Sequence, residues 1–120
     1  MSFNQPAGKL AAEAAECANS QGAFWPYHDI LFANQTGSSD QYSDRRLLAF
    51  ADELKLDGEE FRSCLRDGYS RDVVEQDTNL AAQMGVQATP TVFVNGEKVE
   101  GAQSFEVYRR LIESKLLQTQ

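Results

Sequence analysis

Apolar residues over the first 84 positions recur at intervals of three or four, the spacing that places them on one face of an α-helix. We therefore expect helices within residues 8–21, 22–35, 44–56, 57–68 and 70–84, with a polar loop at 36–43. Ser43 and Asp57 are suitable N-caps for the third and fourth helices, and Gly22, Gly68 and Gly85 are typical C-terminal stops.

The same spacing predicts which side chains are buried. The expected inward faces are Leu10, Ala14, Cys17 and Ala18 in the first helix, Tyr27, Ile30, Leu31 and Phe32 in the second, Leu47, Phe50, Ala51 and Leu54 in the third, Phe61, Cys64 and Leu65 in the fourth, and Val73, Leu80, Ala81 and Met84 in the fifth.

The pattern changes after residue 90. Residues 91–94 (TVFV) are β-branched or aromatic, and Asn95-Gly96 is the strongest short signal for a hairpin turn before the returning strand at 97–99. Ser104 then caps a last helix. Its expected buried side is Phe105, Tyr108, Leu111, Ile112 and Leu116.

This order leaves the strand at 91–94 without a partner on one edge. Its continuous apolar character is typical of a strand covered on both faces and paired on both edges, and two strands alone make a marginal sheet in water. We expect part of the sheet to be missing from these residues.

Composition narrows the class of protein. A chain of 120 residues suits one domain, and its net charge of −7 argues against binding to nucleic acid or to an anionic membrane surface. No run of residues reaches the roughly 20 apolar positions that span a bilayer. The start, MSFNQPAGKL, has no signal-peptide core, so the sequence is either cytoplasmic or a piece of a longer protein.

Two stretches carry a resemblance to a known family. Residues 11–35 (AAEAAECANSQGAFWPYHDILFANQ) and 80–112 (LAAQMGVQATPTVFVNGEKVEGAQSFEVYRRLI) resemble the DsbA-like thiol–disulfide oxidoreductases of the thioredoxin superfamily. The second stretch is quite specific, with Thr-Pro directly before a strand and Asn-Gly-x-x-x-x-Gly-Ala after it.

The resemblance implies a partial thioredoxin-like α/β fold, mostly helical, in which a helical insertion (8–84) precedes a proline loop, hairpin and C-terminal helix (86–117) of a single domain, 1–120. It also implies a cis peptide bond at Thr89–Pro90, lying against the redox centre and presenting backbone to a bound polypeptide. That family's chemistry resides in a Cys-x-x-Cys pair at the start of a helix, and these residues contain no such pair.

Cys17 and Cys64 do not suit the role of the reactive nucleophile. Cys17 lies near the C-terminal end of its predicted helix, and Cys64 shares an apolar face with Phe61 and Leu65, so both settings disfavour a thiolate. Two structural interpretations stay open: two free buried thiols, or a disulfide stabilising the fold by roughly 4 kcal/mol. Some proteins that this chain resembles carry an extra pair in the helical part.

Other chemistry-bearing residues favour structural roles. His28 is the sole histidine and has no metal-ligand spacing or nucleophile near it in sequence, so we expect neither a metal nor a cofactor. Phe24, Trp25, Tyr27 and Phe32 have helical spacing, which favours a core or a surface over a ligand groove. Arg45-Arg46 and Arg109-Arg110 indicate solvated faces.

Three functional hypotheses follow. The first is a portion of a DsbA-like oxidoreductase acting on cysteines of client polypeptides, with Thr89 and Pro90 binding substrate and the chain inactive alone; its parent would be extracytoplasmic. The second is a non-catalytic assembly module that forms a homodimer through residues 91–94. The third, ranked lower, is a glutathione-dependent isomerase or transferase relative. Whether the chain is itself an enzyme stays open.

Overall fold

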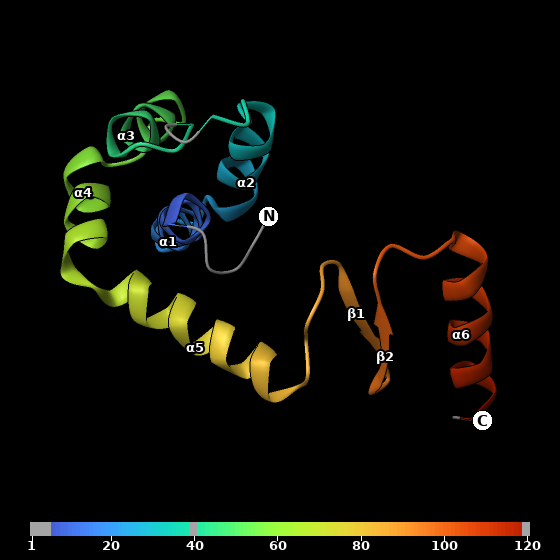
Figure 1. Cartoon of the computed structure of the whole chain (residues 1–120). Coiled ribbons are helices and arrows are strands. Elements are labelled where there is room, and N and C mark those ends of the chain that lie inside the picture. The colour runs from blue at the N-terminus through green and yellow to red at the C-terminus, as the bar shows by residue number, and fades with distance from the viewer. Residues whose placement is uncertain (1–5, 39–40, 119–120) are drawn as a thin grey trace. The chain divides into compact units, whose positions relative to one another are not determined.

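A computed structural model describes residues 6–38 and 41–118 (Figure 1). The ends of the predicted 1–120 domain, and positions 39–40 of the predicted loop, lie outside the described residues. The chain divides into two compact units, Met1–Asn79 and Leu80–Gln120. It is mostly helical with one two-stranded sheet, as the sequence predicted.

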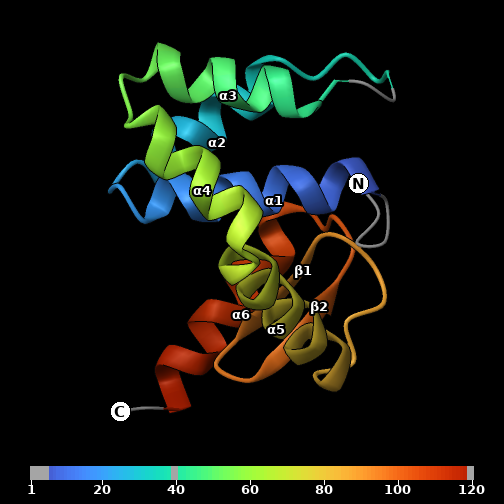
Figure 2. The same cartoon turned by 90° about the vertical axis from the view of Figure 1, so that its left-hand side faces the viewer.

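The first unit, referred to below as the helical unit, contains α1 (Pro6–Asn19), α2 (Phe24–Ala33), α3 (Asp44–Glu53), α4 (Gly58–Asp67) and most of α5 (Tyr69–Gln83). Helix α1 contacts α2, α3 and α4, and Figures 1 and 2 show it lying among them. Most of its buried positions are alanines (Ala11, Ala14, Ala15 and Ala18), so the neighbouring helices can approach its backbone closely.

Local signals fix the ends of these helices. Ser43 and Asp57 accept hydrogen bonds from the backbone amides of Arg46 (3.3 Å) and Glu60 (3.0 Å), which confirms both predicted N-caps. Gly68 ends α4 in the left-handed conformation (φ 83°), as expected of a C-terminal glycine.

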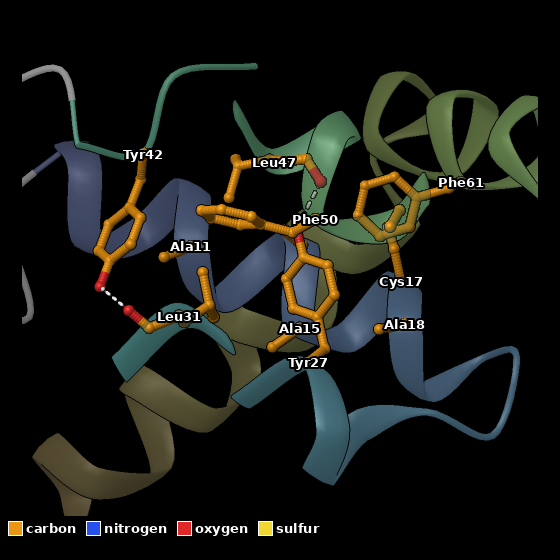
Figure 3. Close-up of a cluster of buried hydrophobic side chains, with 12 residues drawn as sticks. Ala11, Ala15, Cys17, Ala18, Tyr27, Leu31, Tyr42, Leu47, Phe50 and Phe61 are labelled. Carbon is orange, nitrogen blue, oxygen red and sulfur yellow. Dashed lines mark hydrogen bonds between the residues drawn. The ribbon is translucent and has the colours of Figure 1, made fainter. Parts of the chain in front are cut away.

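The core of the helical unit lies between α1, α2, α3 and α4 (Figure 3). Its large members are aromatic: Tyr27, Phe50 and Phe61 pack together, with Tyr27 and Phe61 fully buried. The two tyrosines at this core keep their hydroxyls paired, since Tyr27 donates to the Leu47 carbonyl (2.8 Å) and Tyr42 to the Leu31 carbonyl (2.7 Å). The predicted inward faces of the first four helices are largely confirmed, although Phe32 is 60% exposed.

The second unit, referred to below as the hairpin unit, contains the end of α5, strands β1 (Thr91–Val94) and β2 (Glu97–Glu100), and α6 (Phe105–Gln118). The strands are antiparallel, with Val92 opposite Val99, and α6 contacts β1. Asn95 and Gly96 both have positive φ (48° and 88°), as a type I′ turn requires, so the predicted hairpin is confirmed.

The predicted burial of the last two helices is wrong for this chain. Five residues expected to face inward are largely exposed: Leu80 (54%), Met84 (46%), Phe105 (78%), Ile112 (45%) and Leu116 (58%). The helices form where the pattern predicts them, but the described residues supply no core to cover these faces. Val99 is the one buried hydrophobic residue of the described hairpin unit.

Candidate functional site

The proline loop, residues 86–90, joins the end of α5 to β1. Helix α5 stops at Gly85, which is left-handed (φ 78°), and the amides of Gly85 and Val86 donate to carbonyls of the last helical turn (3.1 and 3.0 Å). This pairing is the C-terminal motif that glycine favours. The chain then passes through the Thr89–Pro90 peptide bond, which is cis, and enters β1 directly.

Two contacts fasten this loop to the hairpin behind it. At its start, the Lys98 ammonium donates to the Gly85 carbonyl (3.0 Å), and at its end, the Gly101 amide donates to the Pro90 carbonyl (2.8 Å). Thr89 and Pro90 themselves are exposed. Hydrogen bonds to a backbone carbonyl at each end therefore hold the loop, while its tip is exposed to solvent.

Sequence reasoning missed the part played by Lys98 and Gly101. Lys98 lies on β2 opposite Phe93, a position that reads from the sequence as an ordinary exposed strand residue. Gly101 gave a usable signal, because a glycine directly after a strand often marks positive φ, and its φ is 77°. No one-dimensional pattern could show that Lys98 reaches back to the end of α5.

Both cysteines of the sequence lie in the helical unit and are joined to each other. Cys17 of α1 and Cys64 of α4 form a disulfide with their Cα atoms 5.8 Å apart. Cys17 is only 1% exposed, within the cluster drawn in Figure 3, and Cys64 packs against that cluster. Of the two interpretations that the sequence left open, the structure has the bonded one, and neither sulfur is a free thiol.

His28 lies on α2 among aromatic neighbours. Its Nδ1 is 3.1 Å from a carboxylate oxygen of Asp29, and its ring lies 4.6 Å from that of Phe32 and 5.2 Å from that of Trp25. No group of three or more potential metal-ligating side chains occurs in the described part of the chain. His28 thus has a structural setting at the surface of the helical unit.

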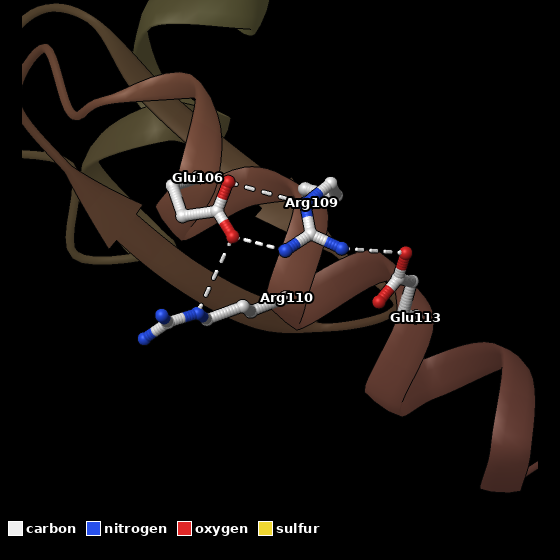
Figure 4. Close-up of polar contacts among 4 residues, drawn as sticks. All are labelled: Glu106, Arg109, Arg110 and Glu113. Atoms are coloured by element: carbon white, nitrogen blue, oxygen red, sulfur yellow. Dashed lines mark hydrogen bonds and ion pairs between the residues drawn. The ribbon is translucent and has the colours of Figure 1, made fainter.

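The paired arginines of α6 form a surface network (Figure 4). Arg109 donates to both Glu106 and Glu113, and Arg110 pairs with Glu106 (3.6 Å). The hydrogen bond to Glu106, followed by that to Glu113, raises the pKa of Arg109. All four are neighbours at helical spacing on an exposed face, as predicted for a solvated surface.

Across residues 6–38 and 41–118, no helix is both long enough and apolar enough to cross a bilayer.

Comparison with known proteins gives a family and several relatives. A family model described as Thioredoxin matches residues 1–114. The chain is 42% identical over 101 residues to a protein named Na(+)/H(+) antiporter NhaA 3 of Salinispora tropica, covering 84% of this chain and 15% of that one. It is 27% identical over 118 residues to disulfide bond formation protein D of Bacillus subtilis, covering 95% of this chain and 53% of that one.

A third relative is a protein named ClpXP adapter protein SpxH of Bacillus licheniformis, 35% identical over 91 residues that cover 70% of this chain and 29% of the relative. The chain therefore spans about half the length of the disulfide bond formation protein and a smaller share of the other two. No solved structure matches the chain.

Proposed function

We propose that this chain, which belongs to the DsbA-like branch of the thioredoxin family, is the client-binding portion of a thiol–disulfide oxidoreductase acting on protein cysteines. The observation that carries the proposal is the exposed Thr89–Pro90 tip, fastened at both ends and followed directly by β1. The only strand paired with β1 among the described residues is β2, so we assign its other edge to a further strand of the parent protein and the exposed Thr89–Pro90 tip to the client.

The exchange reaction itself needs sulfur that this chain does not offer. A thiolate attacks one sulfur of a disulfide, a mixed disulfide forms as the other sulfur leaves, and a second thiol then displaces the first. Cys17 and Cys64 are already bonded to each other, and Cys17 is buried, so neither is an accessible nucleophile. We infer that the reactive pair belongs to other residues of the parent protein and that this chain is redox-inactive alone.

Inactivity is tested by insulin reduction with dithiothreitol as electron donor. We expect the chain to leave the uncatalysed rate unchanged. Turnover above that rate, abolished by Cys17→Ser, would overturn this part of the proposal.

Client binding is tested separately by NMR titration of the ¹⁵N-labelled chain with an extended peptide in which serine replaces cysteine. The expected result is saturable shifts confined to amides of residues 88–94 and 101, weakened by Pro90→Ala and retained in the control Ala102→Ser. Shifts spread over the helical unit, or equal affinity in both variants, would contradict a role for the proline loop.

The open edge of β1 also supports a second candidate, a non-catalytic module that dimerises through residues 91–94. Val92 on this strand is 38% exposed, and two copies pairing edge to edge would each gain a missing neighbour. Light scattering separates the candidates: a dimer at micromolar concentration that Phe93→Pro converts to monomer favours assembly, because Phe93 is in a non-hydrogen-bonded pair with Lys98 and its amide therefore points to the free edge, where proline cannot donate. A monomer at that concentration rules it out.

We further propose that the parent works outside the cytoplasm. The Cys17–Cys64 bond supports this location, since disulfides persist in oxidising compartments and are rare in the cytosol. Alkylation of thiols in intact cells, followed by mass spectrometry, should leave both cysteines unlabelled. Labelling of both would place the chain in a reducing compartment.

A further inference from the structure

A groove crosses the helical unit where the turn after α1 meets the start of α2. It has a volume of about 480 Å³, within the size range of binding sites for small groups. Gly22 in this turn has no side chain to fill the space, and nothing lies within 4 Å of where its Cβ would be. The lining residues are Glu16, Asn19, Gly22, Phe24, Trp25, Pro26 and Asp77.

One wall of the groove is aromatic and held in place. The ring of Trp25 meets the ring of Phe24 edge to face at 5.0 Å and lies 5.2 Å from the ring of His28, yet Trp25 is 68% exposed. An exposed indole face attracts cations through its quadrupole. Because neighbouring rings already hold Trp25, ordering it around a ligand costs little.

The charged groups in the groove are all acidic. Glu16 of α1 and Asp77 of α5 are the two charged lining residues, and neither has an ion-pair partner among the described residues. Glu16 accepts one long hydrogen bond from the Asn19 amide (3.4 Å), which leaves its second oxygen available. The net charge of −7 adds to the negative potential of this wall.

The aromatic ring of Trp25 on one side of the groove and the two carboxylates in its lining together favour an organic cation as ligand. An anion would be repelled by both carboxylates, and a metal ion would need more ligands than a groove with two carboxylates offers. A lysine or arginine side chain suits both walls, because its stem covers apolar surface while its head stacks on an indole and pairs with carboxylates.

We propose that this groove binds a lysine or arginine side chain of a polypeptide, with Trp25 stacking on it and Glu16 and Asp77 neutralising its charge. The site lies wholly within the helical unit, so the experiments that test it do not depend on the role proposed for the proline loop.

Trp25 provides the readout, because it is the only tryptophan in the sequence. The chain is titrated with the peptide acetyl-Gly-Arg-Gly-amide, with its lysine analogue and with its citrulline analogue, which keeps the shape of arginine but lacks the charge. We expect saturable changes in Trp25 fluorescence with the two cationic peptides only, weakening as salt is raised. An equal response to citrulline, or no saturable response to arginine, would overturn the proposal.

Matched variants locate the site. Glu16→Gln and Asp77→Asn should each weaken arginine-peptide binding about 2- to 5-fold, the range expected for loss of one solvent-exposed ion pair. Glu75→Gln is the control, since it makes the same charge change on α5 at an exposed position outside the groove. Equal weakening in Glu75→Gln and Asp77→Asn would mean a general charge effect and refute the site.

A titration with spermidine distinguishes a basic side chain of a polypeptide from a free polyamine as the ligand. Spermidine carries charges without a polypeptide backbone. Binding of spermidine more tightly than both cationic peptides would refute the polypeptide assignment, whereas weaker binding supports it.

Discussion

The Cys17–Cys64 disulfide allows the sharpest quantitative prediction for this chain. The bond joins α1 to α4, and α1 contributes mostly alanines to the core, each of which buries little apolar surface. We therefore expect the covalent link to supply a large share of the stability of the helical unit. The perturbation is the double variant Cys17→Ala/Cys64→Ala, compared with the oxidised chain.

The magnitude follows from the length of the closed loop. The cysteines are separated by 47 positions, for which the chain-entropy relation gives about 4 kcal/mol at room temperature. Removing the sulfur of Cys17, which is 1% exposed, costs about 1 kcal/mol more in lost packing. Domains are typically stable by about 5–15 kcal/mol, so a loss near 5 kcal/mol brings this unit close to unfolding.

Urea denaturation measures the loss. Trp25 lies in the helical unit, so its fluorescence follows that unit alone, while circular dichroism at 222 nm follows all helices. With a denaturant dependence of about 2 kcal/mol per M, the loop entropy alone lowers the urea midpoint by about 2 M.

The control for this comparison is the reductant. A phosphine reductant should lower the midpoint of the wild-type chain nearly to that of the double variant and should leave the variant unchanged. The reasoning would be refuted by a wild-type midpoint insensitive to complete reduction, because the bond would then contribute nothing through the unfolded state. Two alkylated cysteines on the unreduced chain would refute the bond itself.

Three further substitutions test individual contacts. Burial raises the pKa of Tyr27, so above about pH 10 the unfolded chain releases a proton that the folded chain keeps, and the free energy of unfolding should fall as pH rises. Urea titrations at about pH 8 and about pH 11 measure this fall. Tyr27→Phe should reduce it, whereas the control Tyr69→Phe should not. Ser70 is fully buried with its hydroxyl unpaired, so Ser70→Ala should raise the free energy of unfolding by about 1 kcal/mol, and a lower value would contradict this. Lys55 has φ of 60°, so Lys55→Gly should stabilise by roughly 0.5–1 kcal/mol in thermal melts, and a loss of stability would contradict the assignment of strain to this residue.

Much of the fold could be predicted because its signals are local. Ser43 and Asp57 cap helices through bonds to amides three residues away, and Asn95-Gly96 adopts positive φ within the turn itself. Such interactions depend on a few neighbouring residues and are therefore written in the sequence at short range.

The end of the third helix was missed because it lacks the glycine that usually marks a helix C-terminus. The third helix was predicted to run to residue 56 but ends at Glu53. Lys55 takes the left-handed position that glycine normally fills, and the Leu56 amide donates to the Ala51 carbonyl (3.0 Å) in the same closing motif seen at Gly85. The pattern of apolar residues continued through this end, so nothing in the sequence marked it.

Of the two candidate sites, one depends on neighbouring residues and was predicted, and the other depends on residues distant in sequence and was not. The proline loop was predictable from Thr-Pro before a strand, because the motif is contiguous. The groove at Trp25 was not predicted, because it also needs Asp77, a residue of α5 that is distant in sequence. Spacing along α2 alone favoured a core or a surface for these aromatic side chains, and only the packing of separate helices creates a concave wall.

The exposed faces of α5 and α6 mark the limit of reasoning from amphipathic patterns. Such a pattern predicts which side of a helix is apolar, but whether that side is covered depends on residues elsewhere. In the hairpin unit, Phe105 and Leu116 are more than half exposed, and β1 has one strand partner among the described residues. The helical unit, by contrast, has its own aromatic core and a covalent link. The unit bearing the proline loop is thus the one whose apolar faces lack cover, and we infer that the parent protein supplies this cover together with the reactive sulfur.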